Sequence, residues 1–169
     1  AIKAMFPKVN RQILATASTE WRESGAYEAA KAIDGSKDTR WAPSDEQSKD
    51  WWLEVNFGTD RTFNSTLINE AFNRVTAYRI QYWNGSAWAT CASGSLIGTN
   101  KMDKFNPVTT SQVRLSIGSV SSKTPSICEF ETHLDDGPNL AHSDALIVQE
   151  GRKGSRAIRI SSAGAVAVA

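Results

Sequence analysis

Apolar residues at every second position constrain the fold of this chain more than any other feature. Leu53, Val55 and Phe57 alternate with polar residues, and the pattern recurs at residues 113–117. A period of two is that of a strand with one buried face, because successive side chains point to opposite faces. Clusters of Gly, Ser, Asn and Asp separate the runs, as is typical of a sandwich or barrel. The sequence therefore predicts an all-β fold.

Seven strands are expected, at residues 13–18, 51–57, 62–71, 78–83, 87–91, 112–117 and 127–134. Alternation predicts these core residues: Leu53, Val55, Phe57, Tyr78, Ile80, Tyr82, Val113, Leu115, Ile117, Cys128, Phe130 and Leu134. Asn84 and Gly85 lie between two runs and supply the positive φ angles of a tight two-residue hairpin turn. Residues 27–33 are Ala-rich and predict one or two helical turns, ended by Asp34 and Gly35.

The 169 residues suit one main domain with a remainder. We expect residues 1–10 to be an N-terminal leader, residues 11–135 to form the domain, and residues 136–169 to form a tail. Within the tail, residues 145–149 and 157–161 flank a Gly-containing turn like the arms of a hairpin. A linker, the first strands of a neighbouring domain, and a hairpin packed on the main domain all stay open.

Charge and composition exclude several kinds of partner. Lys and Arg number 19 and Asp and Glu 18, with no basic window, so the attraction that drives binding to nucleic acid or an anionic membrane is missing. No apolar stretch approaches the roughly 20 residues that span a bilayer. The two cysteines, Cys91 and Cys128, leave open one disulfide or two buried thiols, of which we favour thiols. We expect a monomer.

Five motifs occur together in the order and spacing of a known family. They are residues 15–18 (ATAS), 31–35 (KAIDG), 39–41 (TRW), 52–58 (WLEVNFG) and 125–130 (PSICEF). The chain thereby resembles the discoidin-like, or coagulation factor V/VIII type C, domain over residues 11–134. It is also similar to carbohydrate-binding module family 32, especially to modules of bacterial α-L-fucosidases, which carry segments like residues 68–72 and 82–85. The resemblance implies an antiparallel jelly-roll β-sandwich that binds oligosaccharides or polysaccharides, without catalysis, for a secreted or cell-surface glycoside hydrolase.

Residues 34–39 (DGSKDT) gather oxygen donors, and Ca²⁺ takes about six to eight oxygen ligands. An EF-hand does not explain the loop, since Thr39 stands where Gly is needed and Asp45 where Glu is needed. From the residues alone, an Asx turn is the alternative. The resemblance implies a structural calcium ion held by this loop and a Glu on the last strand. Its implied ligands are Asp34, Glu129 and Thr39 through side chains and Lys31, Ser36, Thr39 and Cys128 through carbonyl groups.

Exposed aromatic rings suit the apolar face of a pyranose, and nearby polar side chains then bind its hydroxyl groups. Trp41, Trp52, Trp83 and Trp88 match structural aromatics of the family, whereas Trp21 and Trp51 do not. We expect Trp52 in the core and Trp51, directly before it, on the opposite face. The candidate sugar-binding residues are Trp21, Arg22, Trp51, Glu70, Phe72, Asn73 and Arg74. Glu70 and Arg74 are also interpretable as a surface ion pair.

Galactose-binding members of the family tend to carry an Arg and an Asn on a longer loop before the strand at 78–83, so the resemblance does not point to galactose. Two other functions stay open: an adhesion or phospholipid-binding domain of the same fold, and a small glycoside hydrolase. A hydrolase needs a pair of carboxylates, for which Glu54, Glu70, Glu129 and Glu131 are candidates. Glu129 is better used by the metal, and neither His133 nor His142 has a nucleophile partner. We therefore expect no catalysis.

Overall fold

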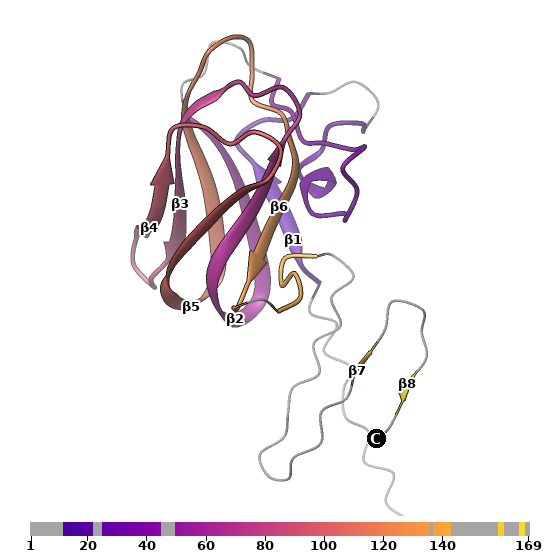
Figure 1. Ribbon diagram of the computed structural model, residues 1–169, viewed down its shortest axis with the longest axis vertical. Coiled ribbons are helices and arrows are strands. Elements are labelled where there is room, and N and C mark those ends of the chain that lie inside the picture. The colour runs from indigo at the N-terminus through magenta and orange to yellow at the C-terminus, as the bar shows by residue number, and fades with distance from the viewer. Residues whose placement is uncertain are drawn as a thin grey trace, which may run out of the picture.

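The computed structural model describes residues 12–21, 25–44, 50–135, 137–142, 159–160 and 166–167. This part of the chain is antiparallel β-sheet almost throughout (Figure 1). The elements are β1 (Leu14–Ala17), the 3-10 helix η1 (Ala29–Ala32), β2 (Trp51–Glu70), β3 (Val75–Trp83), β4 (Trp88–Gly94), β5 (Lys101–Val120), β6 (Ile127–His133), β7 (Arg159–Ile160) and β8 (Val166–Ala167). The predicted all-β sandwich is confirmed. No described helix has the length and hydropathy needed to cross a membrane.

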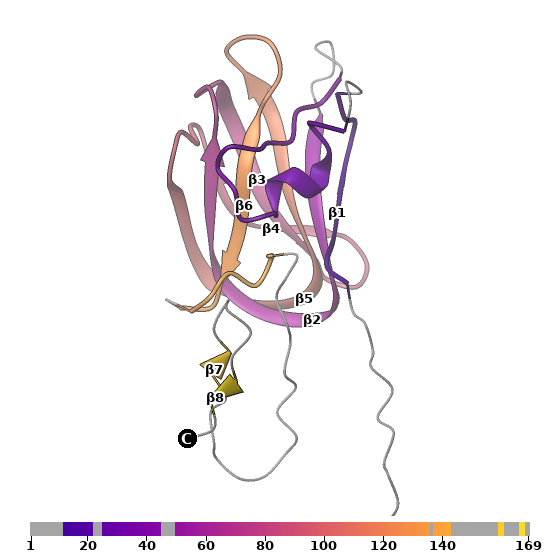
Figure 2. The same ribbon diagram turned by 90° about the vertical axis from the view of Figure 1, so that its right-hand side faces the viewer.

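β2 and β5, each 20 residues long, belong to both layers of the sandwich. The first half of β2 pairs with β1 and with the second half of β5, which also pairs with β3, and β3 pairs with β4. The second half of β2 pairs with β6 and with the first half of β5. Register shifts between Asn56 and Arg61 mark the bend between the halves. A layer in the order β1-β2-β5-β3-β4 thus faces a layer in the order β6-β2-β5 (Figures 1 and 2).

Two strand predictions differ from the structure. The sequence predicted separate strands at 51–57 and 62–71 because Gly58 interrupts the alternation, whereas β2 runs through this glycine, which has φ +68°. The sequence also missed the first half of β5, where the apolar residues Met102, Phe105 and Val108 are three positions apart and show no period of two. Strand identity there comes from pairing with β2 and not from local composition.

The core between the layers is built from the predicted alternating residues. Leu53, Val55 and Phe57 are fully buried, and Phe57 meets Phe63 edge to face at 5.9 Å between ring centroids. Two residues that were predicted to lie in the core, Leu134 and Tyr82, are only partly buried. Leu134 is 40% exposed because β6 ends before it, and Tyr82 only packs against the edge of the core.

The predicted hairpin forms, but not with the predicted turn. Strand pairing ends at Trp83 and Trp88, leaving residues 84–87 between the strands. Gly85 alone takes a positive φ, of +99°. Asn84 acts through its side chain instead, because its Oδ1 accepts hydrogen bonds from the amides of Ser86 and Ala87 at 3.0 and 2.9 Å.

The outer face of β6 is covered by residues 25–44, which include η1 (Figure 2). Trp41 and Ile127 exchange both backbone hydrogen bonds, at 2.8 and 3.0 Å, so this segment is fixed to the start of β6. The helical turn predicted at 27–33 is confirmed by η1, whose Ala29 and Ala32 are buried. β6 is consequently buried on both faces, and a polar side chain on its outer face lies beneath the covering segment.

The first residues of the predicted tail pack on the sandwich. The Leu140 amide donates to the Thr132 carbonyl at 2.7 Å, and Ala141 is fully buried. Further along, β7 pairs with β8. The leader at 1–10 and the proposed hairpin arm at 145–149 lie outside the described residues.

Candidate metal centre and binding surface

The loop after η1 brings four predicted calcium ligands together. The Thr39 hydroxyl oxygen lies 2.8 Å from each carboxylate oxygen of Asp34. It also lies 3.2 Å from the Ser36 carbonyl oxygen and 3.5 Å from the Lys31 carbonyl oxygen. The Ser36 amide donates to Asp34 Oδ1 at 3.0 Å, which closes the predicted Asx turn. Oxygen atoms of all four residues therefore converge on one point of the loop.

Glu129 on β6 supplies a second carboxylate to this corner. It is 2% exposed, and neither carboxylate oxygen has a hydrogen-bond partner of good geometry, although Asp34 and the Gly35 amide lie nearby. Burial first, and then the negative charge of Asp34, raise the pKa of Glu129 to about 8. A buried carboxylate without a donor, facing another carboxylate, is costly unless a cation lies between them. The residues thus fit a cation that takes oxygen ligands.

Among the described residues, no third His, Cys, Asp or Glu side chain completes a cluster with these two carboxylates. The remaining ligands would therefore be carbonyl and hydroxyl oxygens, which suits a hard cation such as calcium. Cys128 is buried, as the alternation predicted, although it is not part of the main hydrophobic cluster. Its thiol is instead surrounded by the charges of Arg40 and Glu129, among others. Together, residues 31–39 and Glu129 form what we call the metal corner.

Gly35 shapes the metal corner in two ways. Its φ of +79° lies in the left-handed region, which a side chain disfavours. A Cβ atom at this position would also lie 2.4 Å from His142 Nε2, so the C-terminal segment packs directly on the loop. The glycine that was predicted to end the helical turn therefore also admits His142.

Three of the predicted sugar-binding residues share a second site at the loop end of the sandwich. Phe72 is 48% exposed, and the guanidinium carbons of Arg74 and Arg40 lie 4.3 and 5.2 Å from its ring centroid. Arg40 also stacks on Tyr27 at 4.8 Å. Tyr27 pairs through its backbone with Trp21, which is 37% exposed. We call Trp21, Tyr27, Arg40, Phe72 and Arg74 the loop-end surface.

Glu70 has a different role from the one predicted. It is 2% exposed, and its Oε1 accepts hydrogen bonds from the amides of Arg74 and Val75 at 2.6 and 3.0 Å. It therefore closes the loop after β2 from inside, and it is neither a sugar contact nor part of a surface ion pair. Asn73 is exposed at the tip of this loop, with φ +51°. The turn carries Phe72 and Arg74 on either side of it.

Trp51 is wrong as a sugar-binding residue. It is 3% exposed and belongs to the hydrophobic core. Trp52 is the half-buried residue on the outer face, with the Arg114 guanidinium carbon 4.8 Å from its ring. The alternation of Leu53 and Val55 extends back to Trp51 and could have placed it. Arg22 lies outside the described residues.

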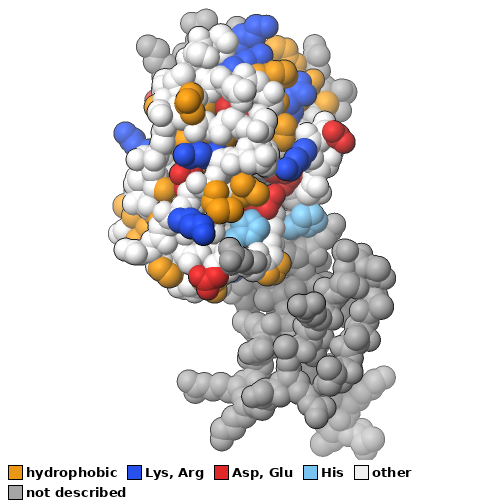
Figure 3. Space-filling view, in the orientation of Figure 1, with side chains coloured by type: hydrophobic (Ala, Val, Ile, Leu, Met, Phe, Trp, Pro, Cys, Tyr) orange, Lys and Arg blue, Asp and Glu red, His pale blue; other side chains and the backbone are white. Residues whose placement is uncertain are grey.

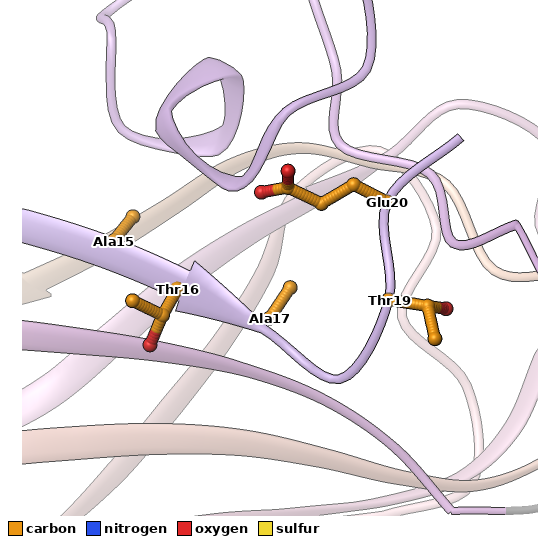
Figure 4. A pocket seen from close by; sticks show the side chains of 5 residues that line it. All are labelled: Ala15, Thr16, Ala17, Thr19 and Glu20. Carbon is orange, nitrogen blue, oxygen red and sulfur yellow. The ribbon is translucent and has the colours of Figure 1, made fainter. Parts of the chain in front are cut away.

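Tyr27 and Arg40 were missed because no local signal marks them. Arg40 lies in a motif interpreted as structural, and it reaches Phe72 only through the fold. A depression of about 370 Å³ beside β1 is a weaker candidate site (Figure 4). Figure 4 shows the short side chains of Ala15 and Ala17 on the same side of the strand as Glu20. The Glu20 carboxylate already accepts a hydrogen bond from the Ala29 amide at 2.8 Å.

The four carboxylates considered for hydrolysis are occupied or buried. Glu54 pairs with Arg114 at 3.0 Å, and Glu131 pairs with His133 Nε2 at 2.8 Å. The Nδ1 atom of His133 lies 2.8 Å from the Gly137 carbonyl oxygen, which leaves neither ring nitrogen for a nucleophile. Glu70 and Glu129 are buried. Both cysteines are free thiols, as predicted.

Known proteins place this arrangement in a family. Residues 15–130 match the F5/8 type C domain. A point mutant of chitosan-binding module 1 from a chitosanase/glucanase of Paenibacillus sp. IK-5 is 31% identical, with a TM-score of 0.64 over 70% of this chain and 92% of that one. The family 32 carbohydrate-binding module of C. perfringens NanJ, in complex with galactose, is 25% identical, with a TM-score of 0.61 over 71% of this chain and 92% of that module.

A GH29 fucosidase of Ruminococcus gnavus shares the fold at 24% identity, with a TM-score of 0.66 over 75% of this chain and 26% of the enzyme. No curated protein matches the chain. The expected resemblance is confirmed over most of the sandwich: this chain belongs to the F5/8 type C, or discoidin-like, domain family.

Proposed function

We propose that this chain is a non-catalytic module that binds glycans through the loop-end surface. The observation that carries the proposal is the exposed Phe72 ring, which contacts the guanidinium groups of both Arg40 and Arg74, while Arg40 also contacts the Tyr27 ring. Aromatic rings suit the C–H face of a sugar, and guanidinium N–H groups suit its oxygen atoms. One structurally similar module is named for binding chitosan and another is in complex with galactose, which supports the same class of ligand.

The surface is open, so affinity for a short oligosaccharide should be low. A ligand on such a surface keeps much of its own area in water, and solvent competes for every hydroxyl group. We expect dissociation constants on the order of 0.1–1 mM, equivalent to roughly 4–5.5 kcal/mol. A single aromatic contact is then a large part of the total.

A glycan array followed by calorimetric titration of the best ligand tests the proposal. Phe72→Ala and Trp21→Ala should each weaken binding at least tenfold, while the melting curve stays unchanged. Leu14→Ala is a matched control, because Leu14 is an apolar residue that is 53% exposed on β1 and is not part of the loop-end surface. Parental affinity in both aromatic variants would place the site elsewhere.

We also propose a structural calcium ion in the metal corner. Asp34 and Glu129 would bind it through carboxylates, Thr39 through its hydroxyl and carbonyl groups, and Lys31, Ser36 and Cys128 through carbonyl groups. When bound, the ion would neutralise the two facing carboxylates and fasten the loop to β6. The convergence of oxygen atoms on Thr39 and the unpartnered Glu129 carboxylate support this assignment.

Chelation tests the calcium proposal directly. A ligand that binds only the folded state at 100 times its dissociation constant adds about 2.7 kcal/mol. For a domain of this size, EDTA should then lower the melting temperature by about 5–10 °C. Asp34→Ala should mimic chelation, whereas Asp38→Ala, an exposed residue of the same loop, should keep the calcium response. An unchanged melting curve with EDTA, together with no metal by elemental analysis, would contradict the proposal.

The module is proposed to act as a monomeric, exported accessory part of a glycoside hydrolase. The fold it shares with part of a GH29 fucosidase supports this setting. Since Glu54 and Glu131 are paired and Glu70 and Glu129 are buried, the chain should release no product from aryl glycosides. Turnover that survives repurification and is lost on mutation of one Glu would contradict the absence of catalysis.

A further inference from the structure

Two guanidinium groups converge on one exposed ring, and neither has a carboxylate partner among the residues that the structure describes. Arg40 and Arg74 both contact Phe72, at 5.2 and 4.3 Å from the ring centroid. The ion pairs among the described residues join other side chains: Lys101 with Asp103, Arg114 with Glu54, and Glu131 with His133. Within that part of the chain, no carboxylate oxygen forms an ion pair with the guanidinium group of Arg40 or Arg74. Two like charges are thus held together on a chain whose formal net charge is only +1.

Both arginines are fixed in place by uncharged groups. Arg74 Nη1 donates to the Thr124 carbonyl at 3.2 Å, and Arg40 Nη2 donates to the Tyr27 hydroxyl at 3.4 Å. Cation–π contacts with Phe72 and Tyr27 hold the planes of the guanidinium groups. Each of these bonds uses one N–H of a five-donor group. The Arg40 Nε atom is buried, so a ligand would bind the terminal nitrogen atoms of the Arg40 guanidinium group. Little side-chain entropy remains to be lost when a ligand binds.

The backbone of the loop is equally fixed. Glu70 holds the amides of Arg74 and Val75 from inside, and the Gly98 carbonyl accepts a hydrogen bond from the Glu70 amide at 2.7 Å. The Glu70 carboxylate is buried beneath the loop and is 2% exposed, so it cannot contact a ligand at the surface. Figure 3 shows Lys and Arg side chains beside hydrophobic ones at the loop end of the molecule. The fold therefore brings two guanidinium groups together at a place that no basic window in the sequence predicts.

We propose that the loop-end surface selects acidic glycans, in which uronic acid carboxylates pair with Arg40 and Arg74 while a sugar ring lies against the aromatic side chains. The inference rests on the proposed function and names its substrate class. Guanidinium groups bind carboxylates through two parallel hydrogen bonds, stronger than those to neutral hydroxyl groups. A neutral glycan leaves the two positive charges without a counterion. A cationic glucosamine chain is repelled by both.

Calorimetric titration of the full chain against three matched probes tests this preference. The probes are trigalacturonic acid, its fully methyl-esterified form, which is neutral, and chitotriose, which is cationic. At low ionic strength, the acid should bind at least tenfold more tightly than its ester, and chitotriose should bind weakest. The preference for the acid should shrink at 0.5 M NaCl, because the Debye length falls to about 4–5 Å.

Arginine variants identify the groups responsible. Arg40→Gln and Arg74→Gln should each reduce the difference between acid and ester several-fold, and the double variant should abolish it. Arg79→Gln is the matched control, because it removes the same charge from an exposed position on β3 and should leave the preference unchanged. Melting curves check that each variant is folded.

The outcomes separate this inference from the proposed function. If the ester or chitotriose binds as tightly as the acid, the preference for acidic glycans is wrong while glycan binding stands. If no probe and no array glycan binds, the proposed function itself fails. Vesicles of phosphatidylserine and phosphatidylcholine form the last arm: binding to these vesicles without binding to trigalacturonic acid would assign the surface to anionic lipid and overturn the inference.

Discussion

The metal corner and the loop-end surface differ in how the sequence builds them. In the metal corner, four of the ligand residues lie within residues 31–39, and only Glu129 and Cys128 come from a distant strand. The loop-end surface takes its five residues from three separate segments, and its two arginines meet only on Phe72. The corner joins the buried Glu129 to half-buried loop residues, and its proposed ligands are largely backbone atoms. The loop-end surface works through side chains, of which Trp21 and Phe72 are exposed. Most of the metal corner is therefore a local sequence motif, whereas the residues of the loop-end surface are brought together only by the fold.

The same difference predicts that the metal corner contributes to stability and the loop-end surface to ligand recognition. Buried groups in the corner contribute to the free energy of unfolding, because any change there alters packing or leaves a charge without a partner. Exposed groups of the surface contribute little to folding and can be changed to suit a ligand. Stability and recognition should therefore be separable by mutation in this domain.

The largest expected effect is on stability, and it tests whether Trp51 belongs to the core and not to a binding surface. Trp51→Ala should cost about 3–5 kcal/mol of unfolding free energy, since it removes a fully packed indole from the core. Trp52→Ala should cost less, because Trp52 is half-buried beneath Arg114. Urea unfolding measures both. An equal or larger loss for Trp52→Ala would show that the outer face and not the core holds the essential indole.

A second variant, Glu129→Gln, removes a negative charge from the metal corner while keeping the size of the side chain. Without calcium it should raise the free energy of unfolding by about 1–2 kcal/mol. The buried Glu129 carboxyl group destabilises the fold because it lacks a hydrogen-bond partner, and an amide group could donate a hydrogen bond to Asp34. With calcium the variant should lose the stabilisation seen in the parent protein, because a charged ligand is gone. Melting curves with calcium and with EDTA measure both effects.

Glu131→Gln provides the control for this variant. It removes the same charge two residues away on β6, where the carboxylate pairs with His133. It should keep the full calcium response. If Glu129→Gln also keeps that response, Glu129 is not a ligand.

The smallest expected effect concerns stability at the loop-end surface. Phe72→Ala should change the unfolding free energy by less than about 0.5 kcal/mol, as substitutions at exposed positions usually do. Chemical denaturation with and without calcium would measure the change. A loss above about 1 kcal/mol would break the comparison, because the surface would then also hold the loop together.

Much of the fold follows from local pattern, and the errors have physical causes. The period-two runs place the core strands because one face of each is buried. The first half of β5 has no period-two pattern in the sequence, and its residues form a strand through pairing with β2. Glu70 was interpreted as exposed because charge is usually solvated, yet two loop amides hold it inside. The burial of Glu70 depends on the backbone conformation of the loop after β2, which amino-acid composition does not predict.

The candidate sites divide along the same line. The calcium ligands could be proposed from contiguous residues, and the loop geometry is consistent with that proposal. Phe72 and Arg74 could be proposed because they are polar or aromatic residues of one short loop. Arg40 and Tyr27 could not, since their contact with Phe72 joins positions that are distant in the chain.

The two long strands have a consequence for how the domain assembles. β2 pairs with three other strands, and its partner β5 begins 31 residues after β2 ends. Contacts of such large sequence separation slow folding, because a long loop must close before any of them forms. Since β2 and β5 each run through both layers, neither layer can be completed alone. We expect a slow, concerted acquisition of structure in which the two sheets appear together, with no stable half-sandwich along the way.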